Sequence, residues 1–270
     1  MRKIVVATDL SERSDRAVER ALRLSSELNS ECIVISIIDD AMPESLGVEL
    51  GTRTETRLRA MLDAHGGTNA LLDVRRGDVV PGVLGLAEDY DADLLVLGLH
   101  RRRDFLDAFR ETTMERIVAL SARPVLLVRD PVDRPYEKVL VAIDFSRACA
   151  EAVSAANRIA PGAEVASIHA YHVPFFGLTG GADTEMARAV RRETEELAAA
   201  WQKNHGVLGN VPEVVAGSFR EVLERKLKSY RPQVLAIGAH TRSGIGLHKL
   251  GSSTSSLMRD PPADLLVALG

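Results

Sequence analysis

The chain has 270 residues, of which 46% are hydrophobic and 27% are charged, and this apolar content excludes a disordered chain. Asp and Glu total 38 against 34 Lys and Arg, and a net charge of −4 argues against a nucleic-acid binder, which usually shows a basic excess. The two cysteines are too few for a disulfide framework. No apolar run is long enough for a membrane helix, and the N-terminal one ends at Asp9, so we expect a cytoplasmic protein without membrane contact.

The two halves of the sequence repeat the same blocks in the same order. The pairs are IVVATDLS at 4–11 with VLVAIDFS at 139–146, LLVLGLH at 94–100 with VLAIGAH at 234–240, and VLLV at 125–128 with LLVA at 265–268. Because the interval is domain-sized, the pattern indicates a duplicated domain rather than a solenoid. A charged linker with prolines lies at 129–138, so we predict domains at 1–132 and 136–270.

Each copy alternates short apolar runs with longer helical patterns. In the first copy the runs lie at 4–7, 32–38, 70–74, 94–97 and 125–128. Runs that are apolar on both faces are typical of central strands in a parallel sheet. The order βαβαβαβαβ, present twice, predicts an α/β fold of two tandem doubly wound parallel five-stranded sheets, Rossmann-like, with helices on both faces.

Helix starts and one helix face can also be predicted. Four residues stand where helix N-caps are expected, namely Ser11, Asp78, Ser146 and Ser218. In the second copy four large apolar residues recur at helical spacing and predict one apolar face of a long helix: Met186, Val190, Leu197 and Trp201.

A candidate ligand site lies at the carboxyl ends of the second copy's strands, where open α/β sheets bind their ligands. Asp144 closes the first strand, and the glycine-rich segment GAHTRSGIGLHKLGSS follows the fourth at 238–253. The N–H groups of such a loop, and of a helix that starts at about Ser252, form an anion site, and a strand-end carboxylate suits ribose hydroxyls. These features predict a nucleotide cradle, and the alternative is a mobile surface loop.

These motifs resemble those of the universal stress proteins, whose nucleotide-binding members carry Gly-x2-Gly-x9-Gly-(Ser/Thr) after the fourth strand and an Asp at the end of the first. The second copy has this pattern with one glycine replaced, as Gly238-x2-Thr241-x9-Gly251-Ser252. The first copy has it with two replaced, as Gly98-x2-Arg101-x9-Glu111-Thr112. Over nearly its whole length, the chain is similar to a tandem universal stress protein.

The resemblance implies an adenine-nucleotide alpha hydrolase-like fold with an adenine nucleotide, ATP or AMP, in the second domain, and Mg²⁺ as a further candidate ligand. It also implies that the fifth strands, 125–128 and 265–268, pair and cover each other's edges. The residues implied to hold the nucleotide are Asp144, Ala170, Gly238, His240, Thr241, Gly251, Ser252 and Ser253. For His240, as for His100, an ordinary loop residue is an equal alternative.

The first domain departs further from the motif. Glu111 stands where a glycine amide would meet phosphate, and a carboxylate there repels an anion. The three arginines at 101–103 either hold a different anion or belong to a solvated loop. Thr241 takes some space from the second loop but keeps a hydroxyl that can face phosphate. We therefore predict nucleotide binding in the second domain.

Other residues point to structural roles or leave alternatives open. His169 and His172 flank Ala170 without further metal ligands, so we predict structural histidines and no metal site. Cys149 has no obvious activating base near it in sequence. Phe175 and Phe176 either cover the nucleotide site or pack between the two domains.

The predicted function is a nucleotide-binding stress-response module that is not an enzyme. The glycine-rich segment has neither a Walker lysine pattern nor a clear catalytic base. The alternatives are a slow ATPase and a tandem scaffold that binds no nucleotide and acts through a protein partner. A homodimer of tandem chains is a further candidate assembly, and we expect neither nucleic acid nor membrane as a partner.

Overall fold

The computed structural model describes residues 1–99, 112–172, 185–205, 211–242 and 249–270. In the first half its elements are β1 (Lys3–Ala7), α1 (Glu12–Leu28), β2 (Glu31–Ile38), α2 (Glu44–Ala64), β3 (Leu71–Arg76), α3 (Val79–Asp89), β4 (Leu94–Gly98), α4 (Thr113–Leu120) and β5 (Val125–Val128). In the second half they are β6 (Lys138–Ala142), α5 (Arg147–Ile159), β7 (Glu164–Tyr171), α6 (Glu185–His205), β8 (Glu213–Ala216), α7 (Phe219–Tyr230), β9 (Val234–Ala239), β10 (Thr241–Arg242), β11 (Lys249–Leu250), α8 (Ser252–Arg259) and β12 (Asp264–Leu269).

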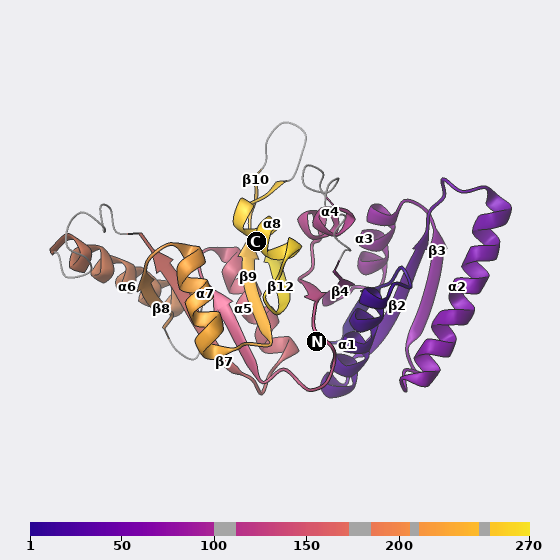
Figure 1. The fold of residues 1–270 in the computed structure, drawn as a ribbon, viewed down its shortest axis with the longest axis horizontal. Helices are drawn as coiled ribbons and strands as arrows, with labels where there is room; N and C mark the ends of the chain where they lie inside the picture. The colour runs from indigo at the N-terminus through magenta and orange to yellow at the C-terminus, as the bar shows by residue number, and fades with distance from the viewer. Residues whose placement is uncertain (100–111, 173–184, 206–210, 243–248) are drawn as a thin grey trace.

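The main sheet has ten strands in the order β3-β2-β1-β4-β5-β12-β9-β6-β7-β8. All neighbouring strands within each half are parallel, and the second half repeats the strand order of the first. Figure 1 shows the halves side by side, with α2 and α6 at opposite ends of the molecule. The predicted tandem α/β fold is confirmed.

The two halves join through their fifth strands. Strand β5 pairs antiparallel with β12, so that Leu126 lies opposite Leu266, and both side chains are fully buried. This pairing confirms the predicted contact between 125–128 and 265–268. It turns two five-stranded units into one continuous sheet and removes two edges that could otherwise pair with other chains.

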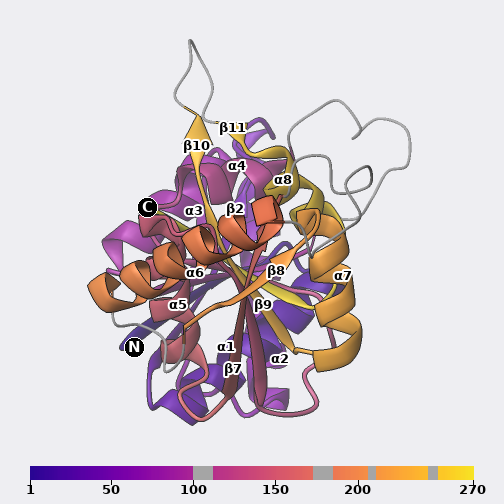
Figure 2. The same cartoon turned by 90° about the vertical axis from the view of Figure 1, so that its left-hand side faces the viewer.

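Helices cover both faces of the sheet because successive strand residues point to opposite sides. Ile4 and Val6 belong to one buried apolar cluster, and Val5 between them belongs to the other. Side chains from α1, α2, α5 and α6 pack in the first cluster, and side chains from α3, α4, α7 and α8 in the second. Figure 2 shows α5 and α6 on one side of the second half and α7 on the other. In the described part of the chain, no helix has both the length and the apolar character needed to cross a membrane.

A buried ionic cluster fastens the linker to both halves. Asp264, the first residue of β12, is fully buried and accepts hydrogen bonds from the backbone N–H groups of Arg129 and Asp130 and from the Tyr136 hydroxyl. The Arg20 guanidinium of α1 lies 3.5 Å from the same carboxylate and 4.2 Å from the centre of the Tyr136 ring. The cluster therefore connects the first helix, the linker and the last strand.

The helix predictions are mostly confirmed, with one correction. Ser11, Asp78, Ser146 and Ser218 each accept a hydrogen bond from a backbone N–H of the first helical turn. The predicted face of α6 is wrong, since Met186 and Leu197 are 58% and 54% exposed. The buried residues of α6 are Ala187, Thr194, Ala198 and Trp201. Small residues allow this helix to pack close to the sheet, and two of the larger apolar residues are left outside.

Candidate functional site

The carboxyl ends of β6 and β9 bring Asp144 and His240 together. Asp144 lies just beyond β6, where its Oδ1 accepts hydrogen bonds from the Ser146 N–H at 3.0 Å and the Cys149 thiol at 2.8 Å. Its Oδ2 lies 3.1 Å from Nε2 of His240, which directly follows β9. Burial raises the pKa of Asp144, but the hydrogen bonds from Cys149, Ser146 and His240 outweigh this effect and hold the pKa below its ordinary value.

The first half contains the same arrangement, in which a strand-end aspartate accepts hydrogen bonds at Oδ1 from two residues that follow it in sequence. We call this arrangement the aspartate loop. Oδ1 of Asp9 accepts hydrogen bonds from the Ser11 N–H at 3.0 Å and the Ser14 hydroxyl at 2.8 Å. Burial raises the pKa of Asp9, and hydrogen bonds from Ser11 and Ser14 again bring it below its ordinary value. Cys149 replaces Ser14 in the second half, where burial and the adjacent Asp144 raise the pKa of the thiol to about 11. The thiol is a hydrogen-bond donor to Asp144 and is not an activated nucleophile.

Gly238 allows a helix to approach the end of β9. A Cβ atom on Gly238 would lie 2.4 Å from the backbone nitrogen of Cys149, at the start of α5. Gly98 has the same role in the first half, where a Cβ atom would lie 2.7 Å from the carbonyl oxygen of Arg13. This first glycine of the motif is therefore needed for packing in both halves, whichever half binds a ligand.

The start of α8 is open. Gly251 occupies the N-cap position, and among the described residues no side chain caps the helix and no atom lies within 4 Å of the position that a Cβ on Gly251 would take. Ser252 and Ser253 follow in the first turn, and both are exposed. The prediction that a helix begins here is confirmed. The first-turn N–H groups have no intrahelical partner, so they can donate to a ligand from outside the helix.

The corresponding helix of the first half is closed by its own residues. Thr112 caps α4, and Oε2 of Glu115 accepts the Thr112 N–H at 2.8 Å, which completes a capping box. Oε1 of the same carboxylate accepts a hydrogen bond from Nε of Arg259, in α8, at 2.9 Å. The Glu115 side chain is only 2% exposed. At an offset of 140 residues, Ser255 stands where the first half has Glu115. Sequence reasoning missed this feature, although Thr-x-x-Glu is a local capping signal.

The remaining predicted residues have the following positions. Ala170 lies in β7, where it pairs with Val215 and is partly buried, and Thr241 begins the short strand β10. His169 makes a structural contact, since its Nδ1 lies 2.7 Å from the carbonyl oxygen of Ile143 and its ring stacks on Phe145 at 4.2 Å. Predictions for His100, Glu111, the arginines at 101–103, the phenylalanines at 175 and 176, and the glycine-rich stretch 243–248 lie outside the described residues.

All of these groups gather at one edge of the sheet because parallel strands end on the same side. Figure 2 shows β10, β11 and α8 together at that end of the second half. At this edge Oδ2 of Asp144 has His240 as its one hydrogen-bond partner among the described residues. The nearby helix α8 starts there without a side-chain cap from those residues. Within the described residues, no group of three or more His, Cys, Asp or Glu side chains could hold a metal ion. The Asp144 carboxylate can accept hydrogen bonds from ligand hydroxyls, and the N–H groups at the start of α8 can donate to an anionic group.

Comparisons with known proteins show the family of the chain and agree with its fold. The sequence model described as "Universal stress protein family" matches the chain twice, over residues 1–129 and 135–268. A universal stress protein from Archaeoglobus fulgidus has a similar structure, with a TM-score of 0.70 and 20% identity over 99% of this chain and 98% of that one. A putative universal stress protein from Pseudomonas aeruginosa gives a TM-score of 0.68 and 16% identity over 100% and 93% of the two chains.

A structure of a universal stress protein in complex with cAMP is 24% identical and covers 47% of this chain and 96% of that one, with a TM-score of 0.40. A search of curated protein sequences found no match. The two full-length structural relatives share the fold of both halves.

Proposed function

The chain belongs to the universal stress protein family, and from this membership we propose that its second half binds an adenine nucleotide, ATP or AMP, at the carboxyl edge of β6 and β9. The protein would act in the cytoplasm as a nucleotide-responsive stress module and would not be an enzyme. This proposal is supported by the differences between the two halves.

The open start of α8 is the observation that carries the proposal. A helix N-terminus attracts anions through unpaired N–H groups and the positive end of the helix dipole. Among the described residues no side chain makes a capping hydrogen bond at the start of α8, whereas in α4 the Glu115 carboxylate accepts the N–H of the N-cap residue Thr112. The space around Gly251 also lets a phosphate approach the backbone. We assign the phosphate groups to the first turn of α8, beside the exposed hydroxyls of Ser252 and Ser253.

Asp144 is the proposed partner of the ribose hydroxyls. Its Oδ1 already accepts two hydrogen bonds, so a ligand has to approach Oδ2, which His240 shares. The Asp144 side chain is 47% exposed, which leaves room for such a contact. His240 is then a positioning residue that holds the carboxylate. The backbone of Ala170, at the end of β7, is assigned to the adenine ring by resemblance to the family.

Fast turnover of the nucleotide is not part of the proposal. Phosphoryl transfer needs cations and positioning groups around the transferred phosphate. Oδ1 of Asp144 already accepts two hydrogen bonds and its Oδ2 is assigned to the ribose, and the described residues offer no cluster of carboxylates beside it. Mg²⁺ would therefore be held mainly by the phosphates of ATP itself, where it neutralises their charge.

The proposal can be tested by calorimetric titration of the full chain with ATP and with AMP, each with Mg²⁺. We expect one binding site per chain, weakened at least tenfold by Asp144→Ala, a loss of about 1.4 kcal/mol. Asp9→Ala is the matched control and should leave the affinity unchanged. Loss of binding in Asp9→Ala but not in Asp144→Ala would place the site in the first half. Hydrolysis of bound ATP at about one turnover per second would show an enzyme instead.

A further inference from the structure

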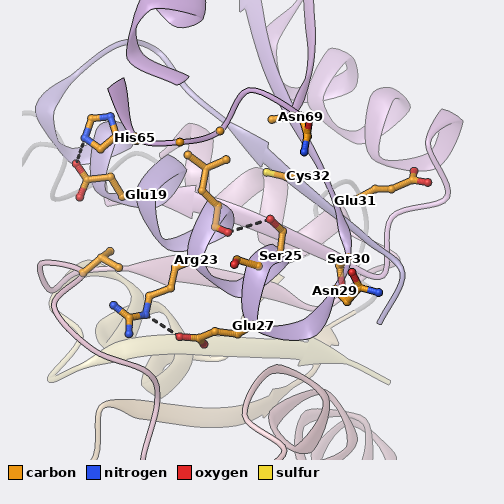
Figure 3. A pocket seen from close by; sticks show the side chains of 16 residues that line it. Glu19, Arg23, Ser25, Glu27, Asn29, Ser30, Glu31, Cys32, His65 and Asn69 are labelled. Atoms are coloured by element: carbon orange, nitrogen blue, oxygen red, sulfur yellow. Dashed lines mark hydrogen bonds and ion pairs between the residues drawn. The ribbon is translucent and has the colours of Figure 1, made fainter. Parts of the chain in front are cut away.

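A hollow lies in the first half at the amino ends of the strands, opposite the carboxyl ends that form the candidate nucleotide site. It has a volume of about 820 Å³ and lies between the C-terminal ends of α1 and α2, above the first residues of β2. Residues 65–70, which connect α2 to β3, form one wall, and Val132 of the linker adds to the rim. Figure 3 shows this hollow with its charged side chains around an interior that contains Cys32. The volume is within the usual range of small-molecule sites.

Acidic side chains outnumber basic ones in the lining of this hollow. Glu19, Glu27 and Glu31 line it together with Arg23 and His65. Two of the carboxylates have partners, since Glu27 lies 2.7 Å from Nε of Arg23 and Glu19 lies 3.2 Å from Nε2 of His65. The Glu31 carboxylate has no hydrogen-bond or ion-pair partner among the described residues, while its backbone N–H donates to the carbonyl oxygen of Arg2. Three carboxylates therefore face one permanent positive charge.

The ends of two helices add to the negative potential of the hollow. Helix α1 ends at Leu28 and α2 at Ala64, and neither has a basic residue in its last turn. The C-terminal end of a helix carries a partial negative charge from its unpaired carbonyl groups and favours nearby cations. Here the backbone and the carboxylates attract the same sign of charge.

The helix ends of the second half that match α1 and α2 carry basic residues. There α5 carries Arg158 in its last turn, and α6 carries Lys203 and His205. At an offset of 135 residues, Ser154 and Gly162 stand where the first half has Glu19 and Glu27, whereas Glu164 begins β7 as Glu31 begins β2. Two of the three acidic residues are therefore found in one copy only, and they do not follow from the shared fold.

The lining fits an extended cation better than a single metal ion. Within the described residues, no three acidic, histidine or cysteine side chains converge closely enough to hold a metal. Apolar groups from Leu22, Cys32, Ala70 and Val132 also line the hollow and provide contacts for methylene groups. Burial raises the pKa of the Cys32 thiol to about 12, so the interior stays neutral.

We propose that this hollow binds a linear aliphatic polyamine. Its separated ammonium groups would pair with Glu19, Glu27 and Glu31, and its methylene chain would lie over the apolar interior. The site is at the opposite sheet edge from the proposed nucleotide site, so this proposal does not depend on nucleotide binding.

Spermidine is the probe, added to the full chain without nucleotide, because polyamines also bind ATP. Amide NMR should show saturable shifts at Gly66 and Gly67, which line the hollow. The double variant Glu27→Gln/Glu31→Gln should weaken binding roughly tenfold, as expected for two partly exposed ion pairs. The control Glu151→Gln/Glu164→Gln removes the same charge from the second half, at residues that are also exposed, and should leave the affinity unchanged.

Each other outcome would overturn the proposal. Equal weakening in both double variants would show a general attraction to a negative protein. Shifts that appear elsewhere, or no shifts at millimolar spermidine, would show that the hollow has no polyamine site. Binding of Mg²⁺ at the same amides, with the same loss in Glu27→Gln/Glu31→Gln and at least the affinity of spermidine, would show a cation site without preference for a polyamine. The melting temperature of each variant without ligand checks that it folds.

Discussion

The two halves of this protein share an aspartate loop and a tightly packed glycine, and they differ in the helix that follows the fourth strand. Asp9 and Asp144 have the same pattern of donors, and Gly98 and Gly238 make the same close contact with a helix start. The first turn of α4, however, is closed by Glu115, and that of α8 is open.

The two domains therefore keep the same fold although the starts of these two helices differ. In the first half the Glu115 carboxylate accepts the Thr112 N–H and the Thr112 hydroxyl accepts the Glu115 N–H, so side chains of the helix itself pair with two N–H groups at its start. Because Arg259 of α8 holds that carboxylate, the second half contributes to closing the first. At the opposite ends of the strands the halves also differ, since Glu19 and Glu27 line the hollow of the first half, and α5 and α6 of the second half carry Arg158, Lys203 and His205 in their last turns.

Breaking the join between the halves should have the largest effect on stability. Asp264→Ala would leave Arg20 and Tyr136 buried without their carboxylate, and breaking a buried ionic cluster of this kind costs about 3–5 kcal/mol. Urea unfolding measures this loss. Asp130→Ala is the control, because its ion pair with Arg129 is 44% exposed on both sides and should contribute less than about 1 kcal/mol. Equal losses in the two variants would contradict a central role for Asp264.

The glycines that the halves share should be equally sensitive. Gly98→Ala and Gly238→Ala each place a methyl group against a helix backbone, and such overpacking costs about 1–3 kcal/mol. Gly162→Ala is the control, since no atom lies within 4 Å of its Cβ position. Thermal unfolding of the three variants compares them. A loss in only one of Gly98→Ala and Gly238→Ala would mean that the glycines have different roles in the two halves.

The helix starts should respond differently to loss of a hydroxyl. Thr112→Ala removes the cap of α4 and should cost about 1 kcal/mol. Ser252→Ala, at the matching position, should cost almost nothing without ligand because Ser252 does not cap α8. The measurement is again urea unfolding. A similar loss in both variants would show that the start of α8 is not open.

The aspartate loops should give both halves the same acid sensitivity. Asp9 and Asp144 have a lower pKa in the folded chain than the ordinary 3.8, so their ionised forms stabilise the fold. This contribution is full above that ordinary value and is lost as the pH falls through the lower folded-state pKa. In Asp144→Asn and in Asp9→Asn, the fall of the melting temperature on acidification should be shallower than in the parent. If the melting temperature of either variant fell as steeply at low pH as that of the parent, this would contradict the hydrogen bonds to that aspartate.

Local signals in the sequence predicted much of the fold, and contacts between distant residues were not predictable. Apolar runs and the N-caps Ser11 and Ser146 depend on neighbours in sequence and were read correctly. The face of α6 was predicted wrongly because large apolar residues were counted, whereas Ala187 and Ala198 face the sheet.

At the candidate site, the position of Asp144 followed from its place after a strand. Its contact with His240 crosses 96 residues, and the ion pair between Glu115 and Arg259 crosses 144. No periodicity links such residues, since strand order alone brings them together. The glycine motif drew attention to Glu111, whereas the carboxylate that closes α4 in the described structure is Glu115.

The most direct test of nucleotide binding at the open start of α8 is a calorimetric titration of ATP into Gly251→Glu. Among the described residues nothing lies within 4 Å of the Cβ position of Gly251, and this substitution places a carboxylate at the helix start, as Glu115 does in the first half. Gly162→Glu adds the same charge at another open glycine, in the turn that joins α5 to β7. We expect the parent and Gly162→Glu to bind ATP equally, and Gly251→Glu to bind at least about tenfold more weakly. Parent-like binding by Gly251→Glu would contradict the assignment of the phosphates to α8.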